Sequence, residues 1–317
     1  MDNPMYTPAP GYGRILAADN PLHPTSFEGW FFTFWAGLIV IVFALPWAFM
    51  AWKRRGDLLP ILALGAGAIT SLGEPMLDHV GHLRWAENLP GPAFSNFGLD
   101  IPILIPPCYM LFMGLEAYWI FMYIQRGITV KQFFMMFAAC GITDAIMENP
   151  GLAMHAYEYY GKQPFEFGSG FPFYWSFTNG VAICTIAVLM HFVWPMVKDK
   201  GWLVVAILPL GIIGTTMGEF GTGFPVFLAI NGEMATWVQW AIGSLTLVLA
   251  VVWIRVLAEF VATEETVDWT FWGLFKARFM LPKQREKYIA DRTIVKRPGV
   301  AAADAAEPVQ GQTKVGV

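Results

Sequence analysis

The stretch "DLLPILALGAGAITSLGEPMLDHVGH", Asp57 to His82, decides the fold class. Its first half is an apolar run typical of a bilayer-spanning helix, which needs ~20 mainly apolar residues. Its second half places a glutamate, a proline, an aspartate and two histidines at the far end of the same helix. Ionisable groups at that depth are costly in hydrocarbon, so we expect them to face the protein interior and to have a function.

The composition of the whole chain also indicates a membrane protein. Of its 317 residues, 56% are hydrophobic and 14% are charged, whereas a soluble domain has ~25% charged residues. Cys108, Cys140 and Cys184 lie in apolar runs without a CxxC motif, which predicts small core residues and no disulfide framework. The first twenty residues lack a cationic region followed by an apolar core, so no cleaved signal peptide is expected.

Seven segments are long and apolar enough to cross the membrane. They are Gly29–Trp52, Leu58–Val80, Ile101–Gln125, Lys131–Tyr157, Pro172–Val197, Trp202–Ile230 and Met234–Phe260. Lysines and arginines concentrate after the first, third, fifth and seventh of them. The positive-inside rule then predicts an outside N-terminus and a cytoplasmic C-terminus. The expected protein is a multi-pass, all-α helix bundle of the cell inner (plasma) membrane.

The domain organisation follows from these spans. We expect an extracytoplasmic segment over 1–28, the transmembrane bundle over 29–260, a cytoplasmic amphipathic and basic segment over 261–297, and a disordered tail over 298–317. Glu74, Glu148 and Glu219 are spaced by 74 and 71 residues, and each lies near Gly or Pro in an even-numbered span. This is a weak repeat of helix pairs after a lone first helix.

Each of the first two glutamates has an aspartate four residues away, which is one helical turn. Asp78 follows Glu74 by four residues and His82 follows it by eight, so at 3.6 residues per turn the three are expected to share one helix face. Pro75 should distort the helix at this point.

The second helix repeats the arrangement. Asp144 precedes Glu148 by four residues, and His155 follows Glu148 by seven. The topology places Glu219 at a related depth in the outer half of its span. The candidate catalytic residues are therefore Glu74, Asp78, Asp144, Glu148, Glu219, His82 and His155.

Three interpretations of these residues compete. They can be structural, hydrogen-bonding across helices and to backbone groups that Pro75 and Pro150 leave free. They can hold a metal, with Glu74, Asp78, His82, Glu148 and His155 as ligands. They can perform acid–base chemistry, since a carboxyl group in an apolar pocket is able to act as a general acid while a second carboxylate takes a proton or stabilises a cation. We favour the third interpretation, without metal or cofactor.

The loops on the outer side are rich in glycine, proline and aromatic residues. They read "LRWAENLPGPAFSNFGLD" and "YEYYGKQPFEFGSGFPFYW". Their aromatic side chains fit an interfacial belt or an aromatic-lined pocket that stabilises a cation. The loops are expected either to form ordered interfacial turns or to close as a lid over a cavity.

Other functional classes are less well supported. The chain has no GxGxxG, Walker or GxSxG motif and no basic groove, so no nucleic-acid partner is expected. A proton-coupled transporter or a ligand-binding seven-helix protein stays open, because intramembrane carboxylates also mark ion pathways. A retinal photoreceptor is disfavoured, since the last span lacks a lysine for a Schiff base.

Three stretches resemble the AveC-like spirocyclase family of integral membrane proteins. They are "EPMLDHVGHLRW", "FGLDIPILIPPCYMLFMG" and "DAIMENPGLAMHAYEYYG". The shared motifs are Glu-Pro-x-x-Asp at Glu74, Ile-Pro at Ile101 and Glu-Asn-Pro at Glu148. The resemblance implies spiroketal formation, in which hydroxyls join a ketone with loss of water.

The sequence thus predicts a membrane-embedded enzyme that uses buried carboxylates for acid–base cyclisation, dehydration or isomerisation. Its partners are expected to be a hydrophobic, polyketide- or terpenoid-like small molecule and the lipid bilayer. Glu148 is assigned as the acid, and Glu74 with Asp78 as base and cation stabiliser. The oligomeric state is left open.

Overall fold

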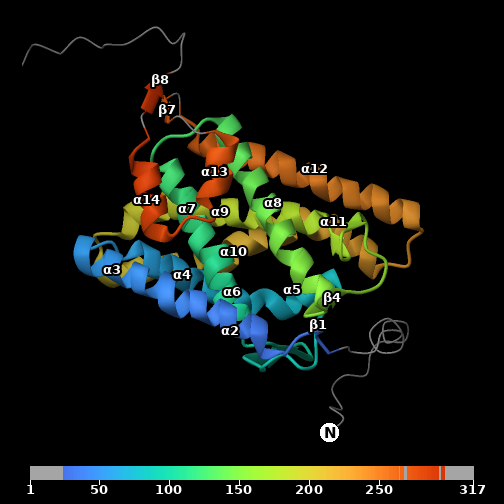
Figure 1. Cartoon of the computed structure of the whole chain (residues 1–317). Helices are drawn as coiled ribbons and strands as arrows, with labels where there is room; N and C mark the ends of the chain where they lie inside the picture. Colours follow the sequence, from blue (N-terminus) through green and yellow to red (C-terminus); the bar gives the residue numbers. More distant parts are fainter. Residues whose placement is uncertain (1–23, 264, 268–269, 293, 297–317) are drawn as a thin grey trace, which may run out of the picture.

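The computed structural model describes residues 24–263, 265–267, 270–292 and 294–296, and it is a bundle of helices (Figure 1). Within this part, seven helices are long and apolar enough to cross a membrane, which confirms the predicted number. They are Trp30–Arg55, Leu59–Gly81, Ile105–Ile124, Val130–Ala153, Tyr174–Val197, Gly201–Asn231 and Thr236–Val261. The sequence-based expectations for the first 23 residues and for the tail from residue 297 concern segments outside the described residues.

Three spans are single α-helices and four consist of consecutive helical segments. The single helices are α8 (Val130–Ala153), α9 (Tyr174–Val197) and α12 (Thr236–Val261). The segmented spans are α2 (Trp30–Ile39), η1 (Val40–Ala44) and α3 (Leu45–Arg55); α4 (Leu59–Thr70), η2 (Ser71–Gly73) and α5 (Glu74–Gly81); α6 (Ile105–Tyr109), η3 (Met110–Leu115) and α7 (Glu116–Ile124); and η4 (Gly201–Ile207), α10 (Leu210–Thr215), η5 (Thr216–Phe220) and α11 (Gly221–Asn231).

The interruptions lie close to the polar residues of interest. The 3₁₀ turn η2 immediately precedes Glu74, and Pro75 opens α5, where its missing N–H is tolerated in the first turn. The segments η3 and η5 are π-helical, and η5 contains Glu219. Single π turns inside α-helices are frequent at functional sites.

The core of the bundle is built around α9, which passes through its middle in Figure 1. This helix packs against α7, α8, α10 and α12. Most of its residues from Tyr174 to Met190 are buried, so its sequence is apolar around the whole helix.

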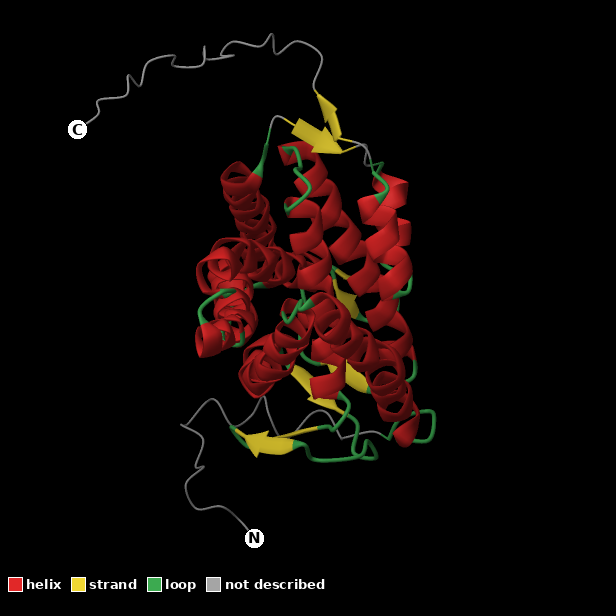
Figure 2. Cartoon of the chain, turned by 90° about the vertical axis from the view of Figure 1, so that its left-hand side faces the viewer, coloured by secondary structure: helices red, strands yellow, loops and turns green. Residues whose placement is uncertain are grey.

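Short strands lie above and below the helices in Figure 2, and also behind them at mid-height. They are β1 (Leu83–Trp85), β2 (Phe94–Asn96), β3 (Leu99–Ile101), β4 (Tyr157–Tyr159), β5 (Glu166–Phe167), β6 (Phe171–Pro172), β7 (Glu265–Val267) and β8 (Ile294–Lys296). Figure 1 places β1 and β4 at the opposite end of the bundle from β7 and β8. Strands β1 and β4, β2 and β3, β5 and β6, and β7 and β8 form antiparallel pairs. The fourth predicted span extended to Tyr157, but the helix ends at Ala153 and Tyr157 begins β4.

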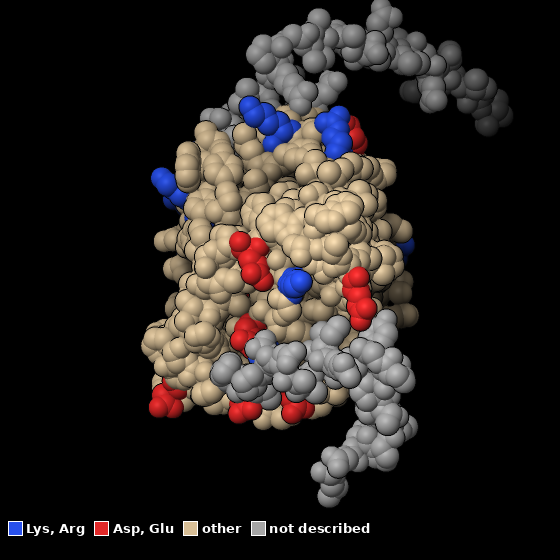
Figure 3. All heavy atoms as spheres, turned by 90° about the vertical axis from the view of Figure 1, so that its right-hand side faces the viewer, with Lys and Arg blue, Asp and Glu red and all other residues tan. Residues whose placement is uncertain are grey.

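Charged residues are sparse on the surface between the two ends. On the face in Figure 3 most of the surface is uncharged, with Lys and Arg mainly at the upper edge and Asp and Glu mainly in the lower half. A belt of uncharged surface is what contact with bilayer hydrocarbon requires. The chain is therefore a multi-pass membrane protein.

The segment after the last span consists of α13 (Phe271–Ala277) and α14 (Pro282–Ala290). The sequence predicted an amphipathic and basic segment here. The two short helices bury Leu274, Ala277 and Ile289 in the main core, and α13 packs against α8.

Two glycines permit a close approach of α4 to the third span. A Cβ added at Gly67 would lie 2.8 Å from Gly114 N and closer still to Tyr109 O. Gly67→Ala is therefore expected to lower the free energy of unfolding by about 1–3 kcal/mol through overpacking. The measurement is thermal unfolding in detergent. Gly37→Ala is the matched control, because a Cβ at Gly37 meets nothing within 4 Å; equal melting temperatures for the two variants would contradict the prediction.

Candidate functional site

Five acidic side chains from three spans meet near the β1–β4 end of the bundle. Glu74 and Asp78 come from α5, Asp144 and Glu148 from α8, and Glu219 from η5. Electrostatic interactions connect Glu74 with Glu148, Asp78 with both of them, Asp144 with Glu148, and Glu219 with Glu74. These five residues are called the carboxylate cluster below. Four are buried, and Glu148 is half-buried, so Glu148 is the member most accessible to a ligand.

Two tyrosines donate hydrogen bonds to the glutamates. The Tyr109 hydroxyl donates to Glu74 Oε2, and the Tyr157 hydroxyl donates to Glu148 Oε2 over 2.5 Å. Tyr109 ends α6 and Tyr157 begins β4, so each glutamate is held by an element outside its own helix. Burial and the neighbouring Glu148 raise the pKa of Tyr157 well above its ordinary value, so Tyr157 stays a donor at physiological pH.

The two aspartates are held in the same way. Trp85 Nε1–H donates to Asp78 Oδ2 over 2.9 Å, and Asn179 Nδ2–H donates to Asp144 Oδ1 over 3.2 Å. Trp85 lies in β1 and Asn179 lies in α9. Side chains fixed by such bonds keep one geometry, which a reactive site requires.

Some polar atoms of the site have no hydrogen-bond partner within the described residues. They are both carboxyl oxygens of Glu219, Asp144 Oδ2 and Thr215 Oγ1. Glu219 is 1% exposed. An ionised carboxylate in such surroundings would cost several kcal/mol. Glu219 therefore needs a proton, a water molecule or a ligand.

The pairing of β1 with β4 places the aromatic donors over the cluster. Trp85 lies opposite Tyr157, and their ring centroids are 5.0 Å apart. Arg84 lies opposite Glu158, and their side chains form an ion pair. The strands follow α5 and α8, so this pair also ties together the outer ends of the two helices that carry four of the five carboxyl groups.

The sequence missed these four donors as functional residues. Trp85 and Tyr157 belong to the aromatic outer loops, for which the sequence predicted only an interfacial belt or a pocket. Tyr109 is 35 residues from Glu74, and Asn179 is 35 residues from Asp144. No local spacing identifies partners at such separations.

The two candidate histidines do not join the cluster, which corrects the expectation of one shared helix face. Helix α5 ends at Gly81 and α8 ends at Ala153, so His82 and His155 follow the helices in left-handed conformations, with φ of 56° and 54°. His82 is buried, with Nε2 3.1 Å from Asn231 Oδ1 and its ring stacked on Tyr160. His155 is exposed.

His82 is expected to make stability depend on pH. Burial lowers its pKa below the ordinary value of about 6.5, so a proton binds the unfolded chain more tightly than the folded one. The contribution of the neutral ring to stability is complete above about pH 6.5 and is lost as the pH falls toward the folded pKa. Between about pH 7.5 and pH 5, the melting temperature of the wild type should fall further than that of His82→Asn. Asn also tolerates the left-handed backbone, and equal falls would contradict the prediction.

The metal alternative receives no support from the geometry. Its predicted ligands were Glu74, Asp78, His82, Glu148 and His155; of the two histidines, His82 contacts Asn231 and Tyr160, and His155 is exposed. Among the residues that the structure describes, no group of three or more His, Cys, Asp or Glu side chains is placed to hold a metal ion.

Comparison of the chain with models of known protein families, with curated proteins and with solved structures gives no match. The resemblance to the spirocyclase family therefore stays a prediction, and the function has to be argued from the geometry of the carboxylate cluster.

Proposed function

We propose that this membrane protein is an enzyme that uses the carboxylate cluster for acid–base cyclisation, dehydration or isomerisation of a hydrophobic substrate. One observation carries the proposal: five carboxyl groups from three spans interact inside an apolar bundle, and four of them are oriented by donors from other elements. Hydrogen bonding between helices does not by itself explain five acidic side chains in one place, because each additional ionised carboxylate repels the others.

The exposure of the side chains supports an assignment of roles. Glu148 is half-buried, so a substrate meets it first, and it acts as the general acid that protonates a departing hydroxyl. Glu74 and Asp78 lie deeper and act as the base for the attacking hydroxyl and as the stabiliser of the cation. The proton returns between Glu148 and Glu74, whose carboxyl groups interact electrostatically.

The aromatic surroundings suit a cationic intermediate. Tyr159 and Trp175 pack together with ring centroids 6.0 Å apart, and Trp175 also packs on Phe227. Ring faces stabilise a nearby cation by ~0.5–2 kcal/mol each. This environment agrees with what the family resemblance implies, an oxocarbenium ion formed with loss of water and without a cofactor.

The test is a turnover assay on the full chain in phosphatidylcholine nanodiscs. A panel of polyketide- and terpenoid-type alcohols is incubated in D₂O, and liquid chromatography with mass spectrometry follows loss of water, ring closure and deuterium incorporation. The expected result is at least one product whose formation survives chelator treatment. Absence of any product, or activity that needs an added metal, would overturn the proposal.

A proton-coupled transporter is the second candidate, and one observation favours it. Neither oxygen of Glu219 has a partner among the described residues, which suits a site that gains and loses a proton. Counterflow of a labelled panel compound in proteoliposomes, without chemical change, would decide for transport.

A further inference from the structure

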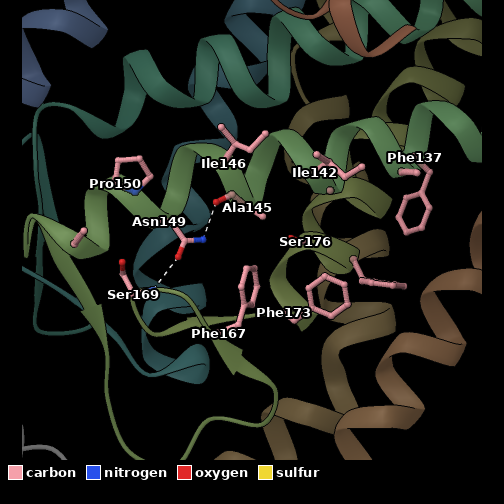
Figure 4. Close-up of a pocket in the computed structure, with 14 residues that line it drawn as sticks. Phe137, Ile142, Ala145, Ile146, Asn149, Pro150, Phe167, Ser169, Phe173 and Ser176 are labelled. Atoms are coloured by element: carbon pink, nitrogen blue, oxygen red, sulfur yellow. Dashed lines mark hydrogen bonds between the residues drawn. The ribbon is translucent and has the colours of Figure 1, made fainter. Parts of the chain in front are cut away.

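A groove on the outside of the bundle runs between α8 and α9 (Figure 4). Its volume is about 820 Å³, within the ~300–1,000 Å³ of ordinary small-molecule sites. One wall is α8 from Phe137 to Ala153, and the other is formed by the start of α9 with the β5–β6 hairpin. We call it the α8–α9 groove. We propose that this groove binds the hydrocarbon chain of an uncharged amphiphile that enters from the bilayer.

The lining of the groove is uncharged. Four of its side chains are phenylalanines, and none is Asp, Glu, Lys, Arg or His. A charged headgroup would lose its hydration there without gaining a counter-charge, which is costly. The complementary ligand therefore carries no charge along the part that occupies the groove.

The bilayer is the source of the occupant because the groove opens onto the lipid-facing surface. Ile142 and Ile146 line it and are 41% and 48% exposed on a membrane-spanning helix. The sixteen steps from Phe137 to Ala153 correspond to about 24 Å along the helix axis, most of the ~30 Å hydrocarbon core. That length fits an extended chain better than a compact ring system.

Neutral polar groups are placed to hold one end of the chain. Asn149 Oδ1 accepts the Ser169 N–H over 2.9 Å, and Asn149 Nδ2 donates to Ala145 O over 2.8 Å, which leaves its second N–H for a ligand. Ser176 lines the same groove, and its buried hydroxyl has no partner in the described part of the chain. Figure 4 shows Ser176 beside Ile142, away from Asn149 and Ser169, so the polar end of the chain is assigned to Asn149.

The groove is adjacent to the carboxylate cluster. Glu148 directly precedes the lining residue Asn149 on α8 and is itself not part of the lining. On α9, Ser176 lines the groove and Asn179, less than one turn away, donates to Asp144. The end of the groove at Asn149 thus lies beside the turn of α8 that carries the proposed acid. Binding of an amphiphile in the groove does not depend on the proposed function. Only its identification as the substrate rests on that function.

The test is photolabelling in phosphatidylcholine nanodiscs with a diazirine-bearing hexadecanol. The probe is expected to label α8 and the start of α9. An excess of unlabelled hexadecanol should suppress this labelling, and hexadecyl phosphate should not. Ile146→Trp should weaken labelling about tenfold, because the ring displaces at least two methylene contacts. Met147→Trp is the matched control, since Met147 is also lipid-exposed but lies outside the groove.

Several outcomes would overturn the inference: labels spread over all spans without saturation, equal labelling of the two tryptophan variants, or equal competition by hexadecyl phosphate. Melting temperatures show that both variants are folded. Glu148→Gln, together with Glu74→Gln, separates the two proposals. If Glu148→Gln and Glu74→Gln both label normally and both keep full turnover, the proposed function fails and the groove stands. If Glu148→Gln abolishes turnover while the wild type shows no saturable label, the groove fails alone.

Discussion

Replacing Glu148 by glutamine is expected to lower turnover by about 100- to 10,000-fold, the range that one general acid contributes. Glutamine keeps the size of the side chain and an oxygen that accepts the Tyr157 hydroxyl, so the packing around the site is preserved. What it removes is the transferable proton. The measurement is the initial rate of product formation in nanodiscs, with whichever panel alcohol the wild type converts.

The control is the same substitution at an exposed glutamate. Glu259 lies on α12, its side chain is 55% exposed, and its partner is Arg255 one turn away. Glu259→Gln should leave turnover unchanged. If Glu74→Gln and Glu148→Gln both keep full turnover in folded protein, the acid–base mechanism is wrong.

Tyr157→Phe distinguishes the proposed acid from a passive buried group. Loss of the hydroxyl removes the donor to Glu148 but keeps the ring contact with Trp85. The dependence of turnover on pH should therefore shift, because a hydrogen bond to the ionised form of a carboxyl group changes its affinity for the proton. A merely structural Tyr157 would change the rate equally at every pH.

The sequence predicted the seven spans because length and composition alone decide whether a helix crosses the bilayer. The pairs Glu74 with Asp78 and Asp144 with Glu148 were found because a spacing of four residues places side chains on one helix face. Their placement together follows from the contacts of α5 with β1, of β1 with β4 and of β4 with α8, while their role in catalysis stays a prediction.

The predicted helix face shared by the histidines and the acids was wrong, because it needed the helices to continue. Helix α5 ends at Gly81 and α8 ends at Ala153, and a helical spacing has no meaning beyond those residues. Tyr109 and Asn179 could not be predicted for a different reason. Their hydrogen bonds are tertiary contacts, and the composition of an apolar span does not show which tyrosine or asparagine faces an acid on another helix.

Two arginines of the predicted amphipathic and basic segment after the last span, Arg278 and Arg285, are buried. The Arg278 side chain is 1% exposed. It pairs with Glu116 of α7, donates to Cys140 Sγ of α8 over 3.0 Å, and lies 4.9 Å from the Trp119 ring. Through these contacts the C-terminal helices are fixed to two spans.

Removing one partner of this buried ion pair is expected to have the largest effect on stability. Glu116→Gln leaves Arg278 charged and without its counter-ion, which should lower the free energy of unfolding by about 3–5 kcal/mol. Glu259→Gln removes one partner of an exposed pair, whose side chains are 57% and 55% exposed, and should cost no more than about 1 kcal/mol. Unfolding in detergent, followed by circular dichroism, measures both.

The double variant Glu116→Leu with Arg278→Met tests whether the loss comes from the unpaired charge. Apolar side chains of similar size need no counter-ion, so this variant should recover most of the stability that either single substitution removes. Cys140, which Arg278 contacts, is four residues before Asp144 on α8. The single substitutions should therefore also reduce turnover by displacing α8, while the double variant restores it. Recovery of stability without recovery of turnover would show that the charges of the pair, and not the position of α8, matter to the reaction.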